Sequence, residues 1–222
     1  MKIPKREWLQ ILILTVPFLV AALFWNKLPD RMPIRWDGNS HPVAYGSKTI
    51  GALLLPCVNV LVAVLMMVLP RMDPKFVGYD AETKASLWHT FAIMRCAITT
   101  LLSAVALAGF AATLHPGFPI SPIVIAGIAA LFATFGNQLT KLRPNWFFGI
   151  RTPWTLESRE AWVKTHRLGG KLMMGGGVSL LVLLVPAVRP FFVWIVLSVV
   201  ALIAIVPIVY SYVVCTRSRP AK

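Results

Sequence analysis

Long apolar runs constrain the fold more than any other feature of this sequence. Six of them are long enough to cross about 30 Å of hydrocarbon, which takes about 20 helical residues. They cover residues 8–25, 49–69, 87–113, 120–139, 172–188 and 191–214. Inside hydrocarbon every backbone N–H and C=O must find a partner within the chain, so such runs form helices. The pattern predicts an all-α, polytopic integral membrane protein with six transmembrane helices.

The composition supports one membrane domain over residues 1–222. Hydrophobic residues make up 57% of the chain and charged residues 14%, against about 45–50% and about 25% in soluble domains. No linker tract separates the runs. We expect the first two spans within 8–69, joined by a loop at 26–48. Spans three and four then lie within 87–139, a long loop covers 140–171, and the last two spans lie within 172–214.

The positions of the cations predict the orientation. Sixteen of the 22 Lys and Arg residues lie in segments 1–7, 70–86, 140–171 and 215–222. Short loops that are rich in Lys and Arg stay in the cytoplasm. Both termini and the 140–171 loop are therefore expected in the cytoplasm, and the 26–48 loop outside it. Contact with anionic membrane lipids explains the net charge of +14, and we expect no direct binding of nucleic acid.

The first loop, residues 26–48, contains prolines that favour an extended chain and a turn signal at Asp37-Gly38-Asn39. Asp30, Asp37 and His41 are possible acid–base or metal-binding groups. Their spacing fits no face of a helix, and a short interfacial loop often carries such residues as solvated polar groups. Both interpretations remain open for this loop.

The second loop, residues 140–171, is basic and aromatic, with Trp146 among its aromatic residues. Thr155 is a plausible N-cap of a short helix that Gly169 would end. Trp162 and His166 are four residues apart and share one face of that helix, which could lie on the membrane surface. From the residues alone, this loop is either a membrane-interface connector or a site for a ligand or partner.

Arg95 lies well inside the third predicted span. Its side chain either snorkels to the headgroups or faces the helix bundle, paired with backbone carbonyls or Asn59, where an anion-binding cavity is conceivable. No acid lies inside a predicted span, and neither His-Glu-x-x-His nor Gly-x-Ser-x-Gly occurs. The sequence therefore predicts no enzyme, no cofactor and no metal. A small-molecule or lipid transporter is the alternative to a membrane-embedded binding protein.

Part of the chain resembles a known family. The resemblance rests on the following motifs: Gly136-Asn137, Pro144-Asn145, Gly149-Ile150-Arg151-Thr152-Pro153-Trp154-Thr155-Leu156, Trp162 and Lys164-Thr165-His166-Arg167. Together they resemble the signature of the SdpI family of bacterial membrane proteins. The stretch from Leu28 to Lys48 is similar to the domain of unknown function that commonly precedes this signature. It departs from the usual pattern at Arg35, where a His is expected, and at residues 40–43, which replace Gly-Glu-Pro-Asp.

The resemblance implies a multi-pass protein of the bacterial cytoplasmic membrane that gives immunity to a secreted toxic peptide. It also implies possible signalling, in which the protein holds a cytoplasmic transcriptional repressor at the membrane. The candidate binding or signature residues are Asn137, Asn145, Arg151, Thr155, Trp162 and His166, with Arg95 added from its position in a span. Asn145 is expected to satisfy backbone groups in the turn after Pro144, and Arg151 to make forked hydrogen bonds that Lys cannot reproduce.

Overall fold

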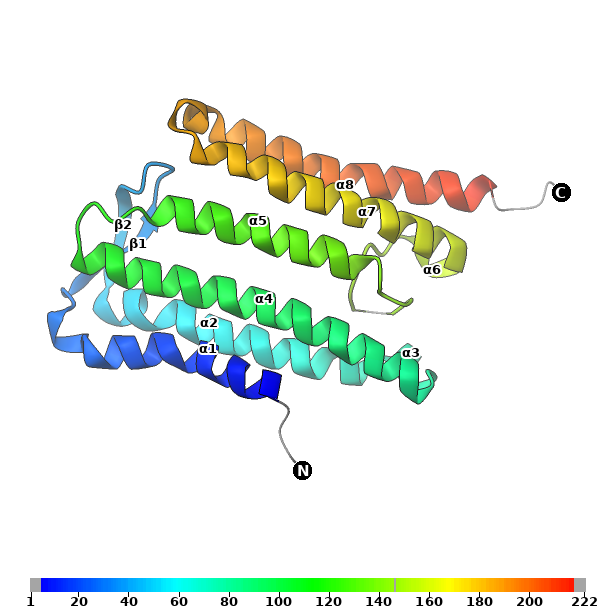
Figure 1. Cartoon of the computed structure of the whole chain (residues 1–222), viewed down its shortest axis with the longest axis horizontal. Coiled ribbons are helices and arrows are strands. Elements are labelled where there is room, and N and C mark those ends of the chain that lie inside the picture. Colours follow the sequence, from blue (N-terminus) through cyan, green and yellow to red (C-terminus); the bar gives the residue numbers. More distant parts are fainter. Residues whose placement is uncertain (1–4, 146, 218–222) are drawn as a thin grey trace. The chain divides into compact units, whose positions relative to one another are not determined.

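The structure, a computed structural model, describes residues 5–145 and 147–217 (Figure 1). It divides into two compact units. Unit 1 comprises Met1–Leu65 and Arg95–Ile128, and unit 2 comprises Met66–Met94 and Ala129–Lys222. Three helices contribute residues to both units, so the expectation of one membrane domain stays a prediction.

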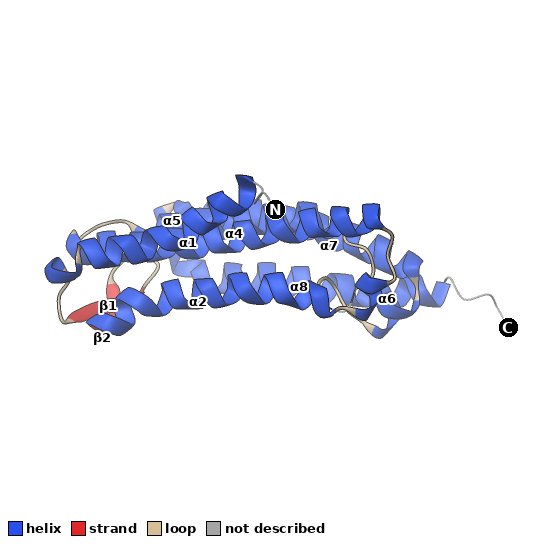
Figure 2. Cartoon of the chain, turned by 90° about the horizontal axis from the view of Figure 1, so that it is seen from below, coloured by secondary structure: helices blue, strands red, loops and turns tan. Residues whose placement is uncertain are grey.

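Helices dominate both units, and one short hairpin interrupts them (Figure 2). The helices are α1 (Lys5–Leu23), α2 (Lys48–Val68), α3 (Pro74–Val77), α4 (Ala81–Leu114), α5 (Ile120–Leu139), α6 (Pro153–Glu157), α7 (Arg159–Leu180) and α8 (Phe192–Arg217). Short 3₁₀ turns cover Trp25–Lys27, Leu69–Met72, Leu181–Leu184 and Pro186–Phe191. The strands are β1 (Arg31–Trp36) and β2 (Pro42–Ser47), paired antiparallel.

Five helical segments of the described residues are long and apolar enough to cross a membrane. They are Lys48–Met72, Ala81–Leu114, Ile120–Leu139, Arg159–Leu184 and Pro186–Arg217. The prediction of an all-α, polytopic membrane protein is confirmed. Helix α1 also forms, but its apolar part, Glu7–Leu23, is shorter than these five. The count of six spans and the cytoplasmic position of both termini stay predictions.

The predicted helix boundaries within 140–171 are wrong. Thr155 is not an N-cap, because Thr152 caps α6: its Oγ1 accepts from the Thr155 N–H, and the Thr155 hydroxyl accepts in return from the Thr152 N–H. Helix α7 starts after Ser158, whose hydroxyl accepts from the Ala161 N–H at 3.2 Å. The apolar helical segment that corresponds to the fifth predicted span therefore begins at Arg159 and not at residue 172.

Close packing explains why the glycines in α7 do not end the helix. Gly169 lies inside α7, and a Cβ on it would come within 2.4 Å of Ile150. A Cβ on Gly170 would lie 2.5 Å from the carbonyl oxygen of Gly136 in α5, and a Cβ on Gly136 would lie 2.5 Å from the carbonyl oxygen of Gly170. Small residues let membrane helices approach closely, so this pair brings the backbones of α5 and α7 together in unit 2.

In unit 1 the predicted loop at 26–48 contains the β1–β2 hairpin. The Met32 side chain is 1% exposed and packs in a cluster with Ala21, Leu28, Ala52 and Phe110. This contact fixes the base of the hairpin against α1, α2 and α4.

A proline in α1 is matched by a hydroxyl on α4. Pro17 lies inside α1, and because it has no N–H it leaves the Ile13 carbonyl without its helical partner. The Ser103 hydroxyl donates to that carbonyl at 2.7 Å. The carbonyl is thereby satisfied, as a helix in hydrocarbon requires.

Candidate functional site

Residues 140–171, called here the signature segment, contain most of the signature residues. The chain of this segment folds back on itself in unit 2. Its first element is a turn held by Asn145, whose side chain is 2% exposed. The Asn145 Oδ1 accepts from the N–H groups of Phe147 at 3.0 Å and Phe148 at 2.6 Å, and its Nδ2 donates to the Arg143 carbonyl. The contact expected from the Pro-Asn pair is present. Trp146 lies outside the described residues.

Tyr79 holds the same turn from the segment that precedes α4. Its hydroxyl donates to the Pro144 carbonyl at 2.6 Å. Burial raises the pKa of the Tyr79 phenol, and the nearby Asp73 carboxylate adds to the effect, so the hydroxyl keeps its proton as a donor. Beside it, the Phe148 ring packs on Phe91 of α4 with centroids 4.8 Å apart.

Trp162 and His166 of α7 form the second element, and both are fully buried, at 0% and 1% exposure. Their rings stack at a centroid distance of 4.0 Å, and Trp162 Nε1 donates to the Leu142 carbonyl at 2.9 Å. The interpretation of an aromatic face on the membrane surface is therefore wrong. This face of α7 turns inward, where the indole N–H satisfies the carbonyl of the preceding turn.

His166 joins α7 to the returning chain and is held in one neutral form. Its Nε2 accepts from the Ile150 N–H at 3.0 Å, which requires an unprotonated nitrogen, so Nδ1 carries the proton and donates to the Trp162 carbonyl at 2.8 Å. Gly149 has φ +109°, and a Cβ there would lie 2.3 Å from His166 Nε2. A side chain at position 149 would occupy the space that this hydrogen bond needs.

A chain of hydroxyls links α6 to α8 and forms the third element. The Thr155 hydroxyl, 1% exposed, lies 2.9 Å from the Ile150 carbonyl. The Thr152 hydroxyl lies 2.9 Å from that of Ser211 in α8. The Ser211 hydroxyl also donates to the Ile208 carbonyl at 2.6 Å.

Four of the predicted site residues, Asn145, Thr155, Trp162 and His166, thus satisfy polar groups of their own chain. The other two in unit 2 are exposed. Asn137, at the end of α5, offers its carbonyl to the Thr140 hydroxyl. Arg151 makes no hydrogen bond or ion pair with the described residues, so the forked bonds expected of it are not formed with that part of the chain.

The outer surface of the segment is cationic. Its exposed cations are Lys141, Arg143, Arg151, Arg159, Lys164, Arg167 and Lys171. Two exposed acids, Glu157 and Glu160, accompany them, and Glu160 is paired with Lys164 at 2.6 Å. The segment therefore combines an internally satisfied polar interior with a surface that suits anionic headgroups or an acidic partner.

Arg95 lies in unit 1 and is buried, at 5% exposure. Its Nε donates to Gln10 Oε1 at 2.7 Å, and its Nη2 donates to the two carboxylate oxygens of Glu7 at 2.9 and 2.8 Å. The snorkelling interpretation is wrong, because a snorkelling guanidinium would be exposed. Arg95 faces the bundle, although its partners come from α1 and not from Asn59.

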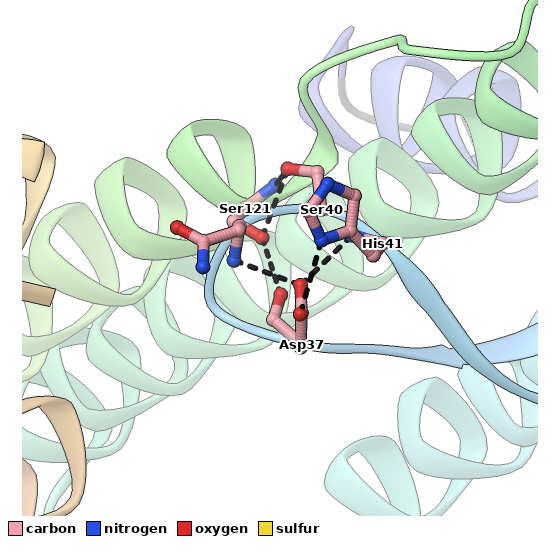
Figure 3. A network of polar contacts seen from close by, with 5 residues as sticks. Asp37, Ser40, His41 and Ser121 are labelled. Atoms are coloured by element: carbon pink, nitrogen blue, oxygen red, sulfur yellow. Dashed lines mark hydrogen bonds and ion pairs between the residues drawn. The ribbon is translucent and has the colours of Figure 1, made fainter. Parts of the chain in front are cut away.

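At the tip of the hairpin, Asp37 is a structural group of the turn (Figure 3). Its Oδ1 accepts from the N–H groups of Asn39 at 2.9 Å and His41 at 2.8 Å. The His41 N–H is the largest cause that lowers the pKa of Asp37. The Ser121 hydroxyl of α5 donates to the Asp37 carbonyl at 2.8 Å, and the Ser40 hydroxyl donates to Ser121 at 3.0 Å. The tip is thereby fixed to the start of α5.

Three contributors to the site were missed from the sequence: Tyr79, Thr152 and Ser211. Thr152 carried a usable signal, since Thr-Pro followed by Thr155 is a pattern for a helix start with Pro at the first position. Tyr79 and Ser211 carried none, because their partners lie 65 and 59 residues away in the sequence.

Two family models match the chain in the regions just described. Residues 141–211 match the SdpI/YfhL protein family, and residues 12–60 match a domain of unknown function, DUF1648. The chain is also similar to Immunity protein SdpI of Bacillus subtilis strain 168, with 26% identity over 179 residues, 81% of each protein. The resemblance to the SdpI family is thereby confirmed. The SdpI match contains the buried network of α6, α7 and α8, and the match at 12–60 contains the hairpin. No solved structure matches the chain.

Proposed function

We propose that this SdpI-family protein is a membrane immunity protein that gives a bacterium resistance to a secreted antimicrobial peptide. The observation that carries the proposal is its similarity to Immunity protein SdpI, which covers 81% of both proteins. The similarity extends far beyond the 71 positions of the SdpI match itself. A role in binding also needs no catalytic group. This agrees with the buried polar side chains of the signature segment, which form hydrogen bonds with polar groups of their own chain.

The proposed location is the bacterial cytoplasmic membrane, with the signature segment inside and the hairpin outside. The distribution of cations supports this orientation. The hairpin offers a surface for the peptide, because Ile34, Val43 and Tyr45 are 45–54% exposed while the base and tip are anchored. Arg35 and residues 40–43 depart from the family pattern in this hairpin, so the peptide recognised here need not be that of the relative.

The second role is signalling, in which the protein holds a cytoplasmic transcriptional repressor at the membrane. The cationic surface of the signature segment supports this role. Its exposed cations outnumber its exposed acids, so the surface suits an acidic face of a soluble partner. Replacement of Arg143 and Arg151 by Gln tests this role. Both side chains are exposed, so we expect normal protein abundance and immunity together with release of the repressor from the membrane fraction.

The test of immunity is complementation of a Bacillus subtilis 168 strain that lacks SdpI. Three proteins are expressed: this chain, the relative's SdpI, and a chimera. The chimera is this chain with its residues 26–48 replaced by the segment of the relative that aligns with them. Survival is measured beside a wild-type competitor that secretes the killing peptide, and each value is normalised to the amount of protein in the membrane.

Protection by this chain supports the function directly. Protection by the chimera alone supports it and assigns peptide choice to the hairpin. If neither protects at membrane levels equal to the relative's SdpI, the proposed immunity function is wrong.

A further inference from the structure

A polar stripe runs through the interior of unit 1. Arg95, Thr99 and Ser103 of α4 are spaced four residues apart, so they share one face, and they are 5%, 0% and 5% exposed. The stripe faces α1 through Gln10 and the Ile13 carbonyl. Most of it is satisfied within the chain, but the end that contains Arg95 is not.

Two donors at that end have no partner among the described residues. Both oxygens of Glu7 accept from the same nitrogen of Arg95, Nη2, and Nη1 makes no hydrogen bond. Gln10 directs Oε1 to Arg95 Nε, which places its Nε2 on the other side of the amide. That Nε2 atom is buried and unpartnered. Buried polar groups normally find a partner, so the Gln10 Nε2 donor calls for an acceptor that Glu7 does not supply.

We propose that Arg95 and Gln10 form a binding site for an oxyanion, a carboxylate or a phosphate, in which Glu7 is the resident substitute. The guanidinium fork matches two oxygens of such a group, whereas Glu7 engages one nitrogen of it. A bound oxyanion in the place of Glu7 accepts from both Nη atoms and from Gln10 Nε2.

Charge and exposure explain why exchange is feasible. The Glu7 side chain is 27% exposed and lies in the first turn of α1, whereas that of Arg95 is 6% exposed. Glu7 can therefore turn to water while Arg95 stays inside. Exchange of one anion for another keeps the site neutral, and neutrality matters because an unpaired charge in hydrocarbon is costly. A lipid phosphodiester and a free anion offer the same chemistry.

The experiment measures thermal unfolding of the purified full chain in a maltoside detergent, which contains no phosphate. Sodium phosphate and sodium acetate are titrated against sodium chloride of equal ionic strength, and phosphatidylglycerol is added in a separate arm. The variants are Glu7→Gln, which removes the resident anion, Gln10→Met, which removes the unpartnered donor, and the neutral double variant Glu7→Gln/Arg95→Gln. Glu160→Gln, at an exposed ion pair of unit 2, is the matched control.

We expect phosphate, acetate or phosphatidylglycerol to raise the unfolding temperature of the parent more than chloride does. The shift should be larger in Glu7→Gln, smaller in Gln10→Met, absent in the double variant and unchanged in Glu160→Gln. A response to phosphatidylglycerol alone assigns the site to a lipid headgroup, and a response to the soluble anions assigns it to a free anion. If Glu7→Gln does not fold, Gln10→Met decides. Equal shifts in the parent, Gln10→Met and the double variant would overturn the proposal and leave a structural ion pair.

Discussion

Replacement of Gly149 by Ala should destabilise unit 2 strongly. Gly149 has φ +109°, and the new Cβ would lie 2.3 Å from His166 Nε2. That nitrogen accepts the Ile150 N–H at 3.0 Å. The change therefore strains the backbone and breaks a part-buried hydrogen bond.

The two effects can be given magnitudes. A non-glycine residue in this region of φ costs about 1–3 kcal/mol, and loss of a buried partner costs about 1–3 kcal/mol. The sum, about 2–6 kcal/mol, is a large part of a typical stability of about 5–15 kcal/mol. A loss of about 3 kcal/mol corresponds to roughly 6–12 °C in the unfolding temperature of a chain of this size.

The assay is thermal unfolding in detergent, followed by tryptophan fluorescence. Gly175→Ala is the control, because this glycine also lies in unit 2, inside α7, and a Cβ there meets nothing within 4 Å. It should leave the unfolding temperature unchanged or raise it slightly. The double variant Gly149→Ala/His166→Ala removes the clash and keeps the backbone strain, so it should lose less than the sum of its parts. An unfolding temperature for Gly149→Ala equal to that of Gly175→Ala would refute the reasoning.

Three further predictions test other contacts. Trp162→Phe keeps the ring but leaves the Leu142 carbonyl unpaired, so it should cost about 1–3 kcal/mol in thermal unfolding; a value equal to the parent's would contradict the inward position of this face. A single cysteine at Val43, in a chain without its native cysteines, should react with an impermeant thiol reagent in intact cells, and reaction only after permeabilisation would reverse the topology. The Asp37 carboxylate has a lowered pKa, so its bonds at the hairpin tip should persist above the ordinary value of 3.8 and be lost as the pH falls below it. The protection factor of the His41 amide in hydrogen exchange should therefore fall only in that acidic range, and Asp37→Ala should lower it above pH 3.8 but not in the acidic range.

The membrane architecture was predictable because hydrocarbon imposes one rule on every long apolar run. Residues 120–139 form helix α5 with the predicted bounds. The start of α7 was missed because its first turns are polar. A helix with charged residues on one side and Trp162 on the other does not show in a hydropathy average.

The interior of the site was predictable only where the partners are close in sequence. The turn at Asn145 follows from the Pro-Asn pair, because an Asn side chain bonds to backbone groups two or three residues on. Periodicity placed Trp162 and His166 on one face but gave no information on what that face meets. The ion pair of Arg95 joins residues 88 positions apart, and no local pattern indicates such a partner.

The contact between Ser103 and the Ile13 carbonyl ties the residue choice at two distant positions to each other. The serine is required only while position 17 is proline, because a residue with an N–H at position 17 would itself bond to that carbonyl. Across related sequences the two positions should therefore change together, with an apolar residue at 103 accompanying a non-proline at 17. Such correlated substitution at positions 17 and 103 would indicate that α1 and α4 are in contact, even in family members whose loops are too different to align.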